Sequence, residues 1–157
     1  RGLGDVYKRQ HNVNETKIIK YINSLNFNKA LNLFNELSET EKMDLIVAES
    51  NCSSNIVILG FITYLLMNDN SCFHHELAAN ALIQMCWLEG AYSLAYYHAS
   101  EMVRIQPDVK NKEFMLFFNE IPEKPMSDDL ALKLAKEILE IDSSCSIAKE
   151  IVEKLSD

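Results

Sequence analysis

The sequence has few cysteines, and none of them stand close together in the chain. Its four cysteines are scattered at Cys52, Cys72, Cys86 and Cys145, and no two of them form a CxxC motif. Scattered cysteines in a chain without a disulfide framework are typical of a reduced, cytoplasmic protein. We therefore expect a cytoplasmic chain that folds without disulfides, a bound metal or another cofactor.

Basic residues are few, and no apolar run is long. Lys and Arg number 15 against 23 Asp and Glu, which gives a formal net charge of −8. Nucleic-acid binding needs clustered Lys and Arg, so an acidic chain is a poor candidate for it. The longest apolar run, residues 56–67, is shorter than the roughly 20 residues that a membrane span needs. We expect no nucleic acid or membrane as partner, whereas a basic protein would suit the charge.

The first ten residues do not look native. The string RGLGDVYKRQ has no initiator Met and resembles the translation of a sequencing adapter. Such remnants are excluded from reasoning about the fold. We therefore expect residues 1–10 to be an artefact and residues 11–157 to form a single helical-repeat domain.

Apolar residues recur at helical spacing along the rest of the chain, which predicts an all-α fold. Ser38 and Glu41 match a capping box, and Ser127 can cap the helix that follows it. The β-branched residues of 55–67 make a strand conceivable there, but the length of the segment favours a helix. Leu94 and Ala95 are expected to face the core. The predicted helices cover about residues 15–25, 26–37, 39–51, 55–67, 73–88, 91–105, 111–121, 128–141 and 147–155.

Two segments repeat without a gap. LAYYHASEMVRI, residues 94–105, aligns with LALKLAKEILEI, residues 130–141, at an offset of 36 residues. A repeat of this length in a helical chain indicates stacked helix pairs. The identical pairs are Leu94 with Leu130, Ala95 with Ala131, Ala99 with Ala135, Glu101 with Glu137, and Ile105 with Ile141.

This pattern resembles the tetratricopeptide repeat. In that family the second helix has small residues at a fixed spacing and a proline about twelve residues on, which Ala95 and Pro107 match. Met102 and Ile138 stand where the family prefers alanine. The segment is also similar to small uncharacterised bacterial proteins with an EGAY core. The resemblance implies a right-handed stack of antiparallel helix pairs, an α-α superhelix, with a C-terminal capping helix.

Polar residues form one line on the otherwise apolar helix at 73–88. Asn80 and Gln84 follow Glu76 at four-residue spacing, which places the three on one face. In the tetratricopeptide register the first helix of each pair lines a concave groove, with Trp87 as an apolar anchor. Alternatively, Asn80 and Gln84 only satisfy backbone groups or face water. The groove residues implied by that register are Leu77, Asn80, Gln84 and Trp87, followed by Glu113, Leu116 and Glu120.

Tyr92, Tyr96 and Tyr97 form the densest aromatic patch of the sequence. Tyr92 and Tyr96 are four residues apart and share a helix face. They could anchor a partner, because tyrosine is enriched in binding hot spots. Alternatively, they pack against Phe114, Phe117 and Phe118 of the next predicted helix.

Catalytic and metal sites are disfavoured. Cys72 and His74 are too close in sequence for the usual zinc spacing, and His75 adds only a sequence neighbour. Cys86 and His98 are unfavourable as a nucleophile and its base, because thiolate formation is disfavoured in an apolar helix.

We therefore predict a non-enzymatic module that binds a protein or peptide, of basic or neutral character, in the groove. The alternative is an immunity-type protein that neutralises a basic bacterial toxin.

Overall fold

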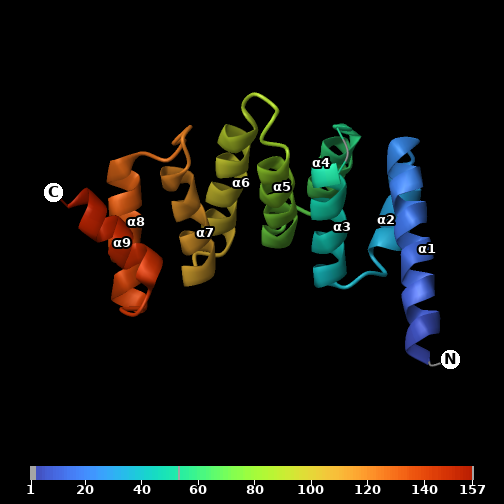
Figure 1. Cartoon of the computed structure of the whole chain (residues 1–157), viewed down its shortest axis with the longest axis horizontal. Coiled ribbons are helices and arrows are strands. Elements are labelled where there is room, and N and C mark those ends of the chain that lie inside the picture. The colour runs from blue at the N-terminus through green and yellow to red at the C-terminus, as the bar shows by residue number, and fades with distance from the viewer. Residues whose placement is uncertain (1–2, 53, 157) are drawn as a thin grey trace. The chain divides into compact units, whose positions relative to one another are not determined.

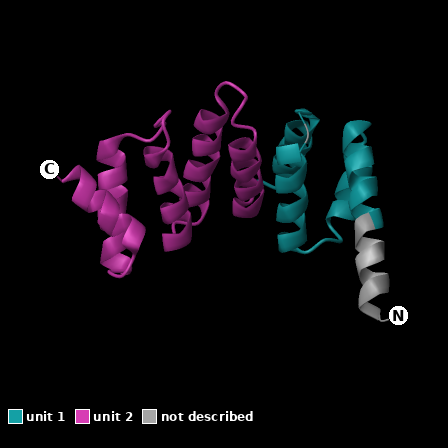
Figure 2. Cartoon of the chain, viewed as in Figure 1, with its two compact units in different colours: residues 1–70 teal, residues 71–157 magenta. Residues whose placement is uncertain are grey.

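The structure is a computed structural model that describes the backbone of residues 3–52 and 54–156, and side chains only from Val13 onward. Within these ranges every regular element is an α-helix, so the predicted all-α class is confirmed (Figure 1). The adapter origin of residues 1–10 stays a prediction, because the side chains of these residues lie outside the part of the chain that the structure describes. The chain divides into two compact units, Arg1–Asn70 and Ser71–Asp157 (Figure 2). A single domain over residues 11–157 stays a prediction.

The first unit contains α1 (Leu3–Asn23), α2 (Phe27–Phe34), α3 (Glu39–Cys52) and α4 (Val57–Asn68). Its core brings together Ile18, Phe34 and Phe61, whose exposed fractions are 1% or less. The predicted capping box is present: the Ser38 backbone N–H donates to the Glu41 carboxylate at 2.8 Å, and the Glu41 N–H donates to Ser38 Oγ at 3.3 Å. The β-branched segment is helical, because an apolar face of α4 packs against α1 and α2.

The turn after α1 holds a strained residue. Leu25 has φ 59° and an exposed fraction of 68%. A left-handed conformation costs a non-glycine residue about 1–2 kcal/mol. Leu25→Gly should therefore raise the free energy of unfolding, by up to about 1 kcal/mol after the entropy lost by glycine is subtracted. Urea unfolding measures this, and Leu25→Ala, which keeps the Cβ, should show no gain; equal gains in both variants would contradict the strain.

The second unit contains α5 (Cys72–Gln84), α6 (Ala91–Ile105), α7 (Val109–Glu120), α8 (Asp128–Ile141) and α9 (Ser146–Leu155). Each of these helices packs against the next one in the chain (Figure 1). Local side chains set the helix starts. Ser71 and Ser127 accept backbone N–H groups of the first turns of α5 and α8, and Asp108 accepts the Asn111 N–H of α7 at 2.8 Å. Gly90, with φ 81°, precedes α6.

The two repeated segments make up most of α6 and most of α8, and their equivalent residues have similar environments. Ala95 and Ala99 are fully buried, as are Ala131 and Ala135. Small side chains at these positions let neighbouring helices approach closely. The prediction that Leu94 faces the core is wrong. Leu94 has an exposed fraction of 47%, and its counterpart Leu130 one of 49%, because both lie on the face of their helix opposite the alanines.

Candidate functional site: an apolar groove on α7 and α9

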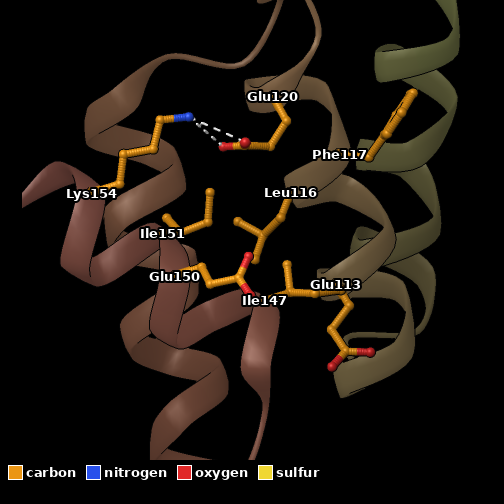
Figure 3. Close-up of a pocket in the computed structure, with 8 residues that line it drawn as sticks. All are labelled: Glu113, Leu116, Phe117, Glu120, Ile147, Glu150, Ile151 and Lys154. Carbon is orange, nitrogen blue, oxygen red and sulfur yellow. Dashed lines mark hydrogen bonds and ion pairs between the residues drawn. The ribbon is translucent and has the colours of Figure 1, made fainter.

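A hollow lies between α7 and α9 (Figure 3). Four residues of each helix line it at i, i+3, i+4 and i+7, the spacing that places side chains on one helical face. Its volume is about 330 Å³, at the lower end of the range of ligand pockets. Apolar side chains form its floor and charged ones its rim. The lining residues are Glu113, Leu116, Phe117 and Glu120 of α7, and Ile147, Glu150, Ile151 and Lys154 of α9.

A second hollow adjoins the first. It has a volume of about 450 Å³ and shares Glu113, Phe117 and Ile147 with the first hollow. The two therefore form one continuous surface on the α5, α7 and α9 side of the second unit, which we call the apolar groove. Its remaining lining residues are Glu76, Ile83, Met102, Lys110, Asn111 and Phe114.

Two apolar side chains of the groove are open to solvent. Phe117 has an exposed fraction of 38% and Ile147 one of 45%, whereas Leu116 and Ile151 beneath them are buried. Both exposed residues belong to both hollows. Burying them against a partner would be favourable by about 25 cal/mol for each Å² of apolar surface removed from water.

The charges of the groove are only partly compensated. Lys154 pairs with Glu120 at 3.1 Å, and Lys110 pairs with Glu76 at 3.2 Å. The Glu113 carboxylate accepts a hydrogen bond from Cys145 Sγ at 2.8 Å, a neutral thiol whose pKa is raised by burial and then by this bond. Glu150 makes no hydrogen bond or ion pair within the part of the chain that the structure describes. The groove therefore carries more acid than base.

Two of the predicted partner-binding residues, Glu113 and Glu120, lie in the groove, together with Leu116. Asn80 and Gln84 are half-buried and line neither hollow. The Asn80 side chain donates to the backbone oxygen of Glu76 at 2.9 Å, as the alternative interpretation of the polar line expected. Leu77, which was predicted to face the groove, is instead fully buried in the core.

Trp87 is separated from the polar line. The predicted helix at 73–88 ends earlier, at Gln84, because the Met85 N–H bonds back to Ala81 and Leu82 and the chain then turns. The tryptophan lies in this turn with an exposed fraction of 53%. There it lines a third, more polar hollow of about 290 Å³ together with Cys86 and Tyr92.

The three tyrosines have different environments, so they do not form one patch. The Tyr96 ring packs against Phe118 of α7 at 5.8 Å, which matches the alternative that the tyrosines pack against the phenylalanines of the next helix. Burial raises the pKa of Tyr96. Tyr97 is exposed and contacts the His98 ring at 5.3 Å. Tyr92 lines the third hollow.

A histidine pair joins α5 and α6. His75 Nδ1 and His98 Nδ1 are 2.9 Å apart, a hydrogen bond in which one neutral ring donates and the other accepts. Burial lowers the pKa of His98 to about 4, and the neighbouring His75 lowers it further in the same direction. Burial is also the main cause of the lowered pKa of His75. The sequence offers both histidines only as members of disfavoured metal or catalytic groupings. Their contact is not predictable from it, because the contact depends on how α5 and α6 pack.

The groove residues on α9 were also missed by sequence reasoning. The sequence predicts a helix over 147–155, on which Ile147 and Ile151 are four residues apart and share a face. Charged residues at 150 and 154 on the same face were the available signal that this face is partly open.

Neither a metal centre nor a membrane segment is found in the described part of the chain. No group of three or more His, Cys, Asp or Glu side chains there is arranged to hold a metal ion. Among the described helices, none is both long and apolar enough to cross a bilayer. Comparison of the chain with models of protein families, with curated proteins and with solved structures found no match, so its function has to be inferred from these residues.

Proposed function

We propose that the protein is a non-enzymatic interaction module that binds a peptide or a segment of a protein in the apolar groove. The observation that carries this proposal is the exposure of Phe117 and Ile147 at the junction of two hollows. Large apolar side chains at the centre of a concave surface, with a polar rim, are typical of binding interfaces.

The residue types of the groove also favour binding over catalysis. The described residues that line it include no Ser, Thr, Cys or His, the side chains that most often act as nucleophile or base. Its lysines are paired with carboxylates.

The arrangement of helices in the second unit supports a tetratricopeptide-like stack. The groove lies mainly on α5, α7 and α9, which alternate with α6 and α8 along the chain; one lining residue, Met102, belongs to α6. In such a stack the alternate helices of successive pairs line a shared face, and that face binds extended or helical peptides. The equivalent burial of Ala95 and Ala131 is the pattern expected of a repeat. The right-handed superhelix is part of the proposal.

A peptide-display selection tests the binding function. A random library selected on the full chain should yield peptides whose affinity falls at least about tenfold in Ile147→Ser, because truncating a hot-spot residue at the centre of an interface costs about 2 kcal/mol or more. Phe117→Ala should have the same effect. Leu94→Ser is the matched control, since Leu94 is as exposed as Ile147 but lies outside the groove.

Circular dichroism shows whether each variant keeps its helices, and only folded variants are compared. The proposal is wrong if the library yields no binders to the wild type. It is equally wrong if the selected peptides bind Ile147→Ser and Phe117→Ala as tightly as the wild type.

A further inference from the structure

The charges of the groove are unevenly distributed along it. Glu120 and Lys154 neutralise each other at one end (Figure 3). Glu113 lies at the opposite end of the α7 face, one helical turn from Phe117. Glu150 lies on α9 between Ile147 and Ile151, on the same face as both. Two carboxylates that have no cationic partner among the described residues therefore flank the exposed apolar pair, Phe117 and Ile147.

Glu150 is placed to meet a partner. Figure 3 shows its side chain reaching from α9 over the hollow, beside Ile147 and Leu116. The side chain is exposed, so its carboxylate is hydrated when the groove is empty. A partner that covers the hollow removes part of this water. An acidic side chain on the partner would repel the carboxylate, and a neutral donor such as a Gln amide would replace the water only with an uncharged hydrogen bond. A Lys or Arg on the partner would replace the lost hydration with a charge-assisted hydrogen bond.

We propose that the occupant of the groove is a peptide segment with apolar anchor residues and a Lys or Arg within one helical turn of them. The anchors bury Phe117 and Ile147, and the cation pairs with Glu150 and Glu113. This inference rests on the proposed binding function and adds the chemistry of the partner. The net charge of −8 on the whole chain acts in the same direction, because it attracts basic segments at long range.

The test uses three labelled helical peptides with the same Leu and Phe anchors. They differ only at two flanking positions, which are Lys, Gln or Glu. Binding to the full chain is measured by fluorescence anisotropy. Near 0.01 M salt, the Lys peptide should bind about 5-fold tighter than the Gln peptide, and the Glu peptide should bind weakest. At about 1 M salt the preference should disappear, because exposed charges are then screened.

Two variants on the same helix locate the effect. Glu150→Gln should remove at least about half of the preference for Lys, measured as the ratio of the affinities of the Lys and Gln peptides for the same variant. Glu153→Gln makes the same change at an exposed position of α9 outside both hollows, so it should keep the full preference. Equal losses in the two variants would mean that only overall charge matters, and would overturn the assignment to Glu150.

The other outcomes separate this inference from the proposed function. If the Lys and Gln peptides bind equally, and both lose affinity in Ile147→Ser, the groove binds peptides but the cationic preference is wrong. If none of the three binds, both the function and the inference fail. A dimer of the wild type that Ile147→Ser abolishes in sedimentation would place a second copy in the groove, and would also overturn the proposed occupant.

Discussion

Phe118→Ala should lower the free energy of unfolding of the second unit by about 3–5 kcal/mol, the usual cost of truncating a buried phenylalanine. Phe118 is fully buried, and its ring contacts Tyr96 at 5.8 Å, Phe117 at 5.2 Å and Phe114 at 5.9 Å. Its removal leaves a cavity between α6 and α7 and loses three aromatic contacts. In thermal unfolding we expect Tm to fall by more than about 10 °C.

Phe117→Ala is the matched control for this prediction. Phe117 is the next residue of α7, but it is partly exposed, so its loss removes less buried surface. We expect Phe117→Ala to be destabilising by less than half as much as Phe118→Ala. Equal costs would contradict the conclusion that Phe118, through its contact with Tyr96, stabilises the packing of α6 against α7.

The helices were predictable because their signals are local. The predicted limits of 91–105 and 128–141 match α6 and α8. Gly90 and Ser127 precede these helices and Pro107 follows α6, so the start and stop signals stand in the sequence itself. The end of α5 was missed, because no glycine or proline marks the turn that begins at Met85.

The candidate site was less predictable, because it depends on tertiary packing. Glu113 and Glu120 could be proposed from spacing along one helix. Ile147 and Glu150 belong to the groove only because α9 lies beside the same face of α7. Whether an apolar residue is exposed also depends on tertiary packing. Leu94 is apolar and helical, yet it faces water, since the buried alanines on another face of α6 form the contact between helices.

Acidification should destabilise the second unit through the His75–His98 pair. In the unfolded chain both rings have a pKa near 6.5, whereas the folded His98 has a pKa of about 4 and the folded His75 a lowered one. Between these pH values the unfolded state binds more protons, so the stability present above pH 6.5 is lost as the pH falls toward 4. His75 is buried but His98 is only half-buried, so screening by water keeps the expected loss to about 2 kcal/mol.

His98→Gln isolates this contribution. Glutamine can keep a hydrogen bond to His75 but does not titrate, so the variant should lose less stability between pH 7 and pH 4 than the wild type does. The difference should be the share of His98, about 1–2 kcal/mol in urea unfolding, because the buried His75 ring still titrates in the variant. Acidic groups such as Asp108 and Asp128, whose pKa values are lowered by hydrogen bonds, contribute equally to both proteins and cancel in the comparison.

A second variant tests whether the effect belongs to the pair. Tyr97→Phe alters the exposed ring beside His98 but leaves both histidines in place, so its stability should follow the same pH dependence as the wild type.

The geometry of the His75–His98 pair explains why the loss of stability at low pH is large. At low pH both Nδ1 atoms would carry protons 2.9 Å apart, and the pair could no longer form its hydrogen bond. Parallel curves for wild type and His98→Gln would show that the two rings remain in contact with water and that the α5–α6 contact does not depend on their charge.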